Sequence, residues 1–183
     1  MKKLNSIAIA AASLLLANTG LAADDPVVIG DVTMPEVQSS AAYEEIKKKL
    51  GKWQGKMTQS LTGEVFDVSY EWKLTSGGNT ITETIIEDGV EMLTTYSDED
   101  GELVVKHYCA LGTEPVFSVT QASDGVLAIS LDESRSNLSH DRHDFVDSMK
   151  WTVDPDDSNS MTFENVVNLD GELTTNRAEL RKI

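Results

Sequence analysis

The sequence predicts an all-β fold, with about ten antiparallel strands preceded by one short helix. From Gly51 onward, apolar and polar residues alternate with a period of two, as in strands that bury one face. Turn pairs such as Gly77-Gly78 and Asp88-Gly89 separate these runs at short, even intervals. No helical segment long enough for a parallel crossover lies between the runs. The pattern is typical of an up-and-down barrel or a sandwich.

The first 23 residues are typical of a secretory signal peptide rather than of the fold. Lys2 and Lys3 precede an apolar run, residues 7–17, that is too short to span a bilayer, and Ala22 and Ala23 suit a signal peptidase. No cysteine comes directly after this site, and no second apolar run has membrane length. We expect no lipid anchor and no membrane span, and a mature protein that is periplasmic or secreted.

The charge of the chain is strongly acidic. Without the signal peptide, 13 basic and 31 acidic residues remain, a net charge of −18. Such a surface repels nucleic acid and anionic lipid, so we expect no nucleic-acid partner. The composition does not define an oligomeric state. Cys109 is the only cysteine, which excludes an internal disulfide, and in an oxidising compartment we expect it to be buried.

Residues 24–38 have no sustained periodicity and contain two prolines, so they predict a mature N-terminal arm. The domain, residues 39–183, then begins with an amphipathic helix. Ser39 or Ser40 can cap its start, and Gly51 ends it. Its first turn is acidic and its last turn is basic, which suits the helix dipole. Its apolar face consists of Tyr43, Ile46 and Leu50.

The strands follow the helix in order. The first, from Gly51, places Trp53, Gly55, Met57 and Leu61 on one face. The second, residues 66–74, has the clearest alternation, with Phe66, Val68, Tyr70, Trp72 and Leu74 on one face. The remaining strands are predicted near residues 79–87, 90–97, 102–110, 115–121, 125–131, 148–153, 160–168 and 172–181.

Several predicted inward faces mix apolar and polar side chains. Examples are Thr80, Thr82, Thr84 and Ile86 on one strand, and Val116, Ser118 and Thr120 on another. A barrel whose lining is incompletely apolar usually encloses a cavity rather than a packed interior. The sequence therefore favours a hollow barrel.

The segment KHYCALGTEP, residues 106–115, carries the reactive side chains His107 and Cys109 on one predicted inward face. Residues two apart on a strand have Cα atoms about 6–7 Å apart, which allows a shared cavity. Three interpretations stay open: a cysteine nucleophile with a histidine base, a histidine that anchors a ligand, and an ordinary core pair. No third orienting group supports the catalytic interpretation.

His140 and His143 lie three residues apart in the polar segment 132–147, beside Asp141 and Asp144. With His107 they are a possible metal site, but histidine and aspartate are also ordinary solvated residues of a polar loop. Long connections in such barrels often lie at a cavity mouth, so this segment is also a candidate lid or a surface for a periplasmic partner.

The stretch LGKWQG, residues 50–55, resembles the G-x-W opening of lipocalin-like (calycin) barrels. In that family a tryptophan closes the barrel floor and an arginine from the last strand packs across it. The resemblance assigns the tryptophan position to Trp53 and makes Arg177 or Arg181 the candidate partner, in a structural role.

The chain also resembles a family of uncharacterised bacterial secreted proteins with lipocalin-like domains and an H-Y-C motif. It departs from the family at Thr113-Glu114, where Asn-Gln is usual. The resemblance implies a lipocalin-like barrel and carries no known reaction. Haem-binding relatives place their iron ligand near the last strand, yet no histidine follows His143, and we expect no cofactor. The matching residues are Trp53, Gly55, Trp72, Leu74, Gly77, Gly78, Glu91, Met92, Thr94 or Thr95, Tyr96, His107, Tyr108, Cys109, Gly112, Pro115 and Trp151.

The leading hypothesis is an exported, non-catalytic protein that binds a small, partly apolar or amphipathic ligand inside the barrel. His107 is the expected polar anchor. The alternatives are an enzyme that uses His107 with or without Cys109, and a periplasmic interaction module. The candidate lining residues are His107, Cys109, Tyr70, Trp72, Met92 and Tyr96.

Overall fold

The computed structural model describes residues 27–34, 39–99 and 101–183, and the predicted signal peptide lies outside them. The chain divides into two units, with the boundary after Pro35. The described part of the first unit is a small hairpin, β1 (Val28–Ile29) and β2 (Val32–Thr33), inside the segment that the sequence predicts as an arm. Among the described residues, no helix combines the length and apolar character needed to cross a membrane.

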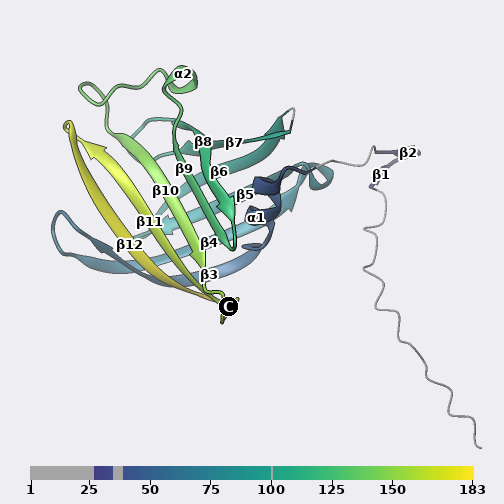
Figure 1. Cartoon of the computed structure of the whole chain (residues 1–183), viewed down its shortest axis with the longest axis horizontal. Coiled ribbons are helices and arrows are strands. Elements are labelled where there is room, and N and C mark those ends of the chain that lie inside the picture. The colour runs from purple at the N-terminus through teal and green to yellow at the C-terminus, as the bar shows by residue number, and fades with distance from the viewer. Residues whose placement is uncertain (1–26, 35–38, 100) are drawn as a thin grey trace, which may run out of the picture. The chain divides into compact units, whose positions relative to one another are not determined.

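In the described part of the second unit, ten antiparallel strands close into a barrel (Figure 1). Each strand pairs with its neighbours in sequence, and β12 pairs with β3 to close the ring. The prediction of an all-β up-and-down barrel is confirmed, and every predicted strand end lies within three residues of the observed one. The strands are β3 Gly51–Gln59, β4 Val65–Thr75, β5 Thr80–Glu87, β6 Val90–Glu99, β7 Glu102–Tyr108, β8 Val116–Ser123, β9 Val126–Leu131, β10 Phe145–Val153, β11 Ser160–Leu169 and β12 Glu172–Lys182.

The predicted helix is α1 (Ala41–Lys47), and it packs against β6, β7, β8 and β9. The Ser40 side chain caps it by accepting a hydrogen bond from the Tyr43 backbone N–H (3.1 Å). The Tyr43 hydroxyl donates to the Gly78 carbonyl (2.7 Å), and Trp53 Nε1 donates to the Lys49 carbonyl (2.8 Å). We call the end of the barrel where β3 begins and β4 finishes the helix end, and the opposite end, where β3 finishes and β4 begins, the open end.

Gly55 marks the seam between β3 and β12. A Cβ atom on Gly55 would lie 1.9 Å from the Glu179 carbonyl oxygen, so only glycine fits this close approach. The cation beside the floor tryptophan is Lys182, whose Nζ lies 5.5 Å from the Trp53 ring centroid.

The predicted partners of Trp53 were wrong. Arg177 lies on the outer face and pairs with Glu164 and Glu179 (both 2.9 Å), and Arg181 pairs with Asp157 on the surface. The buried residues of β12 are the even-numbered ones, such as Ala178 and Leu180, and this parity puts both arginines outside.

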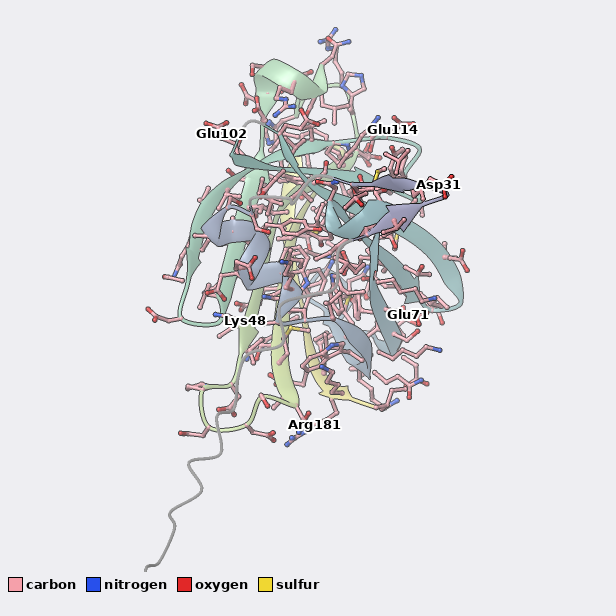
Figure 2. All side chains as sticks on the ribbon, turned by 90° about the vertical axis from the view of Figure 1, so that its right-hand side faces the viewer. Asp31, Lys48, Glu71, Glu102, Glu114 and Arg181 are labelled. Atoms are coloured by element: carbon pink, nitrogen blue, oxygen red, sulfur yellow. The ribbon has the colours of Figure 1, made fainter. Side chains whose placement is uncertain are left out.

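Side chains fill the helix end. Trp151 stacks on Phe163 (5.3 Å between ring centroids), Tyr70 stacks on Trp72 (5.8 Å), and Tyr96 meets Trp151 edge-on (6.1 Å). All five of these aromatic residues are at least 98 % buried. Lys48, Glu71, Glu102, Glu114 and Arg181 lie on the periphery of the barrel in Figure 2.

Two inward faces were predicted wrongly. On β5 the buried residues are Ile81, Glu83 and Ile85, so Thr80, Thr82, Thr84 and Ile86 face outward. On β8 the buried residue is Phe117, so Val116, Ser118 and Thr120 belong to the outer face. Leu61 and Leu74 also differ from prediction, because both are exposed. Leu61 lies beyond the end of β3, and Leu74 pairs with Ile81 of β5 but lies beyond the part of β4 that pairs with β3.

Candidate functional site

The open end of the barrel holds a cavity of about 330 Å³. Its wall is mainly apolar and carries a small set of polar groups, and several exposed residues around it, such as Val90 and Leu111, form its mouth. The lining residues are Gln59, Glu64, Phe66, Ile85, Glu87, Asp88, Val90, Met92, His107, Cys109, Ala110, Leu111, Val146, Met149, Phe163, Asn165, Val167 and Asn176.

The cavity exists because the inward rows lose bulk along the strands. On β11 the row runs from Met161 and Phe163 at the helix end to Asn165 and Val167 at the open end. On β12 the row passes from Leu180 to Ala178 and then to Asn176. A closed ring of ten strands cannot collapse onto these smaller side chains, so space remains.

Two buried tyrosine–glutamate pairs lie within this interior. The Tyr96 hydroxyl donates to Glu83 Oε2 (2.5 Å), and the Tyr70 hydroxyl donates to Glu87 Oε1 (2.8 Å). Burial raises the pKa of Glu83 to about 8 and raises the pKa of Glu87. Glu87 lines the cavity, whereas Glu83 does not. The Glu87 carboxylate is therefore a polar group that a ligand can reach.

His107 lies on the cavity wall, 2 % exposed, at the end of β7. Its Nδ1 shares a hydrogen bond with the Thr94 hydroxyl (2.9 Å), which fixes the ring and leaves Nε2 without a protein partner among the described residues. Burial lowers the pKa of His107 to about 4, so the imidazole is neutral at neutral pH. The side chain offers a ligand one neutral ring nitrogen.

Cys109 is half-buried and lines the same cavity. Burial raises the pKa of its thiol, which keeps the sulfur protonated and weakly nucleophilic. The His107 hydrogen bond goes to Thr94 and not to this thiol. The geometry lacks the thiolate–imidazole pair that a cysteine nucleophile needs.

Two asparagines, Asn165 on β11 and Asn176 on β12, add amide groups to the wall of the cavity. Asn176 Nδ2 donates to Asn165 Oδ1 (2.9 Å). Asn176 is more than nine-tenths buried, and its Oδ1 has no hydrogen-bond partner among the described residues. A buried acceptor without a donor costs stability, unless a ligand or water supplies the donor.

The structure brings together only part of the predicted lining. His107, Cys109 and Met92 line the cavity. Tyr70, Trp72 and Tyr96 also point inward, but they belong to the packed layer on the helix side of the cavity and do not line it.

His140 and His143 are tied into the loop between β9 and β10. His140 Nε2 bonds to Asp147 (2.9 Å), and His143 Nδ1 accepts from the Ser139 backbone N–H (3.1 Å). Across residues 27–34, 39–99 and 101–183, no group of three or more His, Cys, Asp or Glu side chains is arranged to hold a metal ion. The possible metal site of His107, His140 and His143 therefore does not form in this part of the chain.

The same connection is fixed to the barrel rather than placed over the cavity. Asn168 Nδ2 donates to the His140 carbonyl (3.0 Å) and to the His143 carbonyl (2.7 Å), and the Thr113 hydroxyl donates to the Asp144 carbonyl (2.9 Å). It includes one helical turn, α2 (Glu133–Ser136), at the end of the barrel opposite the C-terminus (Figure 1). Residues 132–144 do not line the cavity.

Sequence reasoning missed several wall residues, above all Glu87, Asn165 and Asn176. The β11 and β12 rows contain a usable signal, since Asn165 alternates with Phe163 and Val167, and Asn176 alternates with Ala178. An asparagine on an otherwise apolar face predicts a polar point inside a barrel. The β5 face gives no such signal, because its threonines form an equally plausible inner row.

Comparison with known proteins supports the fold alone. No protein-family model matches the sequence, and no curated protein matches it. A protein of unknown function from the DUF3598 family of Nostoc punctiforme is similar in structure, with a TM-score of 0.54 and 11 % identity over 82 % of this chain. The match covers 51 % of that chain, so this protein spans about half its length.

Two further solved structures are more distant. Rv2717c of Mycobacterium tuberculosis matches with a TM-score of 0.49 and 16 % identity over 80 % of this chain and 99 % of its own. A redesigned β-barrel matches with a TM-score of 0.38 and 12 % identity over 80 % and 99 % of the two chains.

Proposed function

We propose that this protein is an exported, non-catalytic binding protein for a small, partly apolar molecule, which it holds in the open end of the barrel. The observation that carries the proposal is the half-filled interior. Aromatic side chains pack the helix end, and a cavity of about 330 Å³ occupies the other. That volume is near the lower limit of small-molecule sites, about 300–1,000 Å³.

The chemistry of the wall agrees with binding rather than turnover. The wall is largely apolar, and its polar groups are few and fixed by neighbours, as His107 is by Thr94. The cysteine thiol stays protonated, and His107 has a hydroxyl rather than a carboxylate as its partner. These features suit an orienting role for His107.

Native mass spectrometry of the protein, purified from the cells that produce it, tests the proposal. We expect a reproducible extra mass of a small molecule on the wild-type protein. Val167→Phe, which fills the cavity from β11, should lose that mass. The matched control Val166→Phe, which points to the outer face of the same strand, should keep it. A wild-type protein that carries no extra mass and binds no member of a small-molecule library would contradict the proposal.

A further inference from the structure

The charges around the cavity all have one sign. Glu87 lies in the wall, and Glu64 and Asp88 lie at the mouth. None of the lining residues is lysine or arginine, and His107 is neutral because burial lowers its pKa to about 4. An anionic ligand would meet three carboxyl groups without a compensating charge.

Two polar atoms of the wall that have no protein partner in the ranges that the structure describes are carboxylate or amide oxygens, which accept hydrogen bonds. Glu87 uses Oε1 to accept from Tyr70, and Oε2 has no partner among the described residues. Asn176 Oδ1, in a side chain that is more than nine-tenths buried, likewise accepts no hydrogen bond in the described part of the chain. A ligand that satisfies these atoms must bring donors.

We propose that the cavity selects an organic cation, an ammonium group on a compact apolar body, with the ammonium group beside the Glu87 carboxylate. This inference rests on the proposed binding function and names its ligand class. Phe66 and Phe163 in the wall offer apolar contact to the body of the ligand. Asn176 supplies a second acceptor for an N–H or O–H of the same molecule.

The Tyr70 hydroxyl prepares Glu87 for this role. It donates to one carboxylate oxygen (2.8 Å), which fixes the side chain and favours its ionised form. Burial acts in the opposite direction and raises the pKa of Glu87, so in the empty site the ionised form is held at a cost. A bound cation removes that cost, which is the physical origin of the selectivity.

Isothermal titration calorimetry with three probes of one apolar body tests the inference: 2-phenylethylammonium, 2-phenylethanol and 3-phenylpropanoate. We expect the cation to bind about tenfold or more tightly than the alcohol, the scale on which an opposite charge at 4–6 Å stabilises an ion. The anion should give no measurable binding. Glu87→Gln keeps an oxygen acceptor for Tyr70, and it should abolish the preference for the cation while the alcohol still binds.

Glu91→Gln is the matched control, because it removes one negative charge from the exposed face of β6 without touching the cavity. It should keep the preference for the cation. Circular dichroism checks the folding of each variant. If Glu87→Gln fails to fold, Asp88→Asn replaces it, since Asp88 has a positive φ (47°) that asparagine tolerates. This exposed site should lower the preference by about threefold.

The outcomes separate the two proposals. Equal affinities for cation and alcohol, or a preference that survives both Glu87→Gln and Asp88→Asn, overturn the cation inference and leave the binding function standing. Failure of all three probes to bind overturns the cation inference, and native mass spectrometry with the small-molecule library then decides the binding function.

Discussion

The helix end and the open end of the barrel are made by the same strands, yet one is filled and the other hollow. On β4 the row from the helix end begins with Trp72 and Tyr70, which are 1 % exposed, and finishes with the half-buried Phe66 at the cavity. On β11 the inward row likewise changes from Phe163 near the helix end to Asn165 and Val167 toward the open end. The packed core and the cavity are therefore divided along the axis of one barrel, and not between separate domains.

The largest expected effect is the loss of stability when a large side chain in the packed helix end is truncated. Trp151→Ala removes a fully buried indole that contacts Phe163 and Tyr96, and we expect a loss of about 3–5 kcal/mol in the free energy of unfolding. Val146→Ala in the cavity wall should cost only about 1–2 kcal/mol. Urea denaturation measures both, and equal losses at the two ends would contradict the division.

The second prediction concerns Glu83 in the packed layer, which should make the free energy of unfolding depend on pH. Its pKa is 4.5 in the unfolded chain and about 8 in the folded one. Between these values the unfolded state releases a proton that the folded state retains, so the free energy of unfolding falls as pH rises from about 4.5 to 8.

Glu83→Gln lacks this penalty and still accepts from Tyr96 through its amide oxygen. At pH 8 it should therefore gain stability relative to wild type by a few kcal/mol, on the order of 1.4 kcal/mol per pKa unit. The contribution of His107 is common to both proteins and cancels. Lys49, whose pKa burial lowers to about 8, acts above this window. Parallel stability curves from pH 5 to 8 would show that Glu83 ionises normally.

Filling the cavity should affect binding far more than stability. Val167→Phe places a larger apolar side chain in existing space, so we expect the free energy of unfolding to change by less than about 1 kcal/mol. Affinity for 2-phenylethylammonium should fall below detection by calorimetry. Thermal denaturation gives the stability, and a variant that binds as tightly as Val166→Phe would mean that the ligand lies elsewhere.

The smallest effect is expected at Cys109. Since burial raises the pKa of its thiol and limits access, maleimide should label the folded protein at pH 7.5 about tenfold or more slowly than the urea-unfolded chain. A saturating ligand should slow labelling further, because Cys109 lines the cavity. Mass spectrometry of timed samples follows the reaction, and equal rates with and without ligand would place the ligand away from β7.

The strand order was predictable because Asp-Gly or Gly-Gly pairs lie in five of the connections between consecutive barrel strands, and a tight turn joins strands that pair with each other. The closing cation was predictable only in part. The parity of β12, with Ala178 and Leu180 buried, points to Lys182, whereas the family resemblance pointed to arginines of the opposite parity.

The polar interior was harder to predict, because it depends on contacts between distant strands. Nothing local to β5 indicates that Glu83 is buried, since its stabilising partner Tyr96 comes from β6. Similarly, Glu87 becomes a wall residue through Tyr70 of β4. The inward position of His107 could be predicted because β7 alternates cleanly, with Lys106 outside. Cys109 follows directly after this strand and lines the same cavity. The residues of the site could thus be predicted only where the sequence of a single strand determined their position.

The most direct test of the account uses the methionine methyl groups as probes of the two ends. Met92 and Met149 line the cavity, and Met161 is 1 % exposed in the packed end. In NMR spectra of protein labelled with methyl-¹³C methionine, titration with 2-phenylethanol should shift the Met92 and Met149 signals saturably and leave Met161 unmoved. Signals of Met92 and Met149 that stay constant, or that shift no more than Met161, would contradict a binding cavity at the open end.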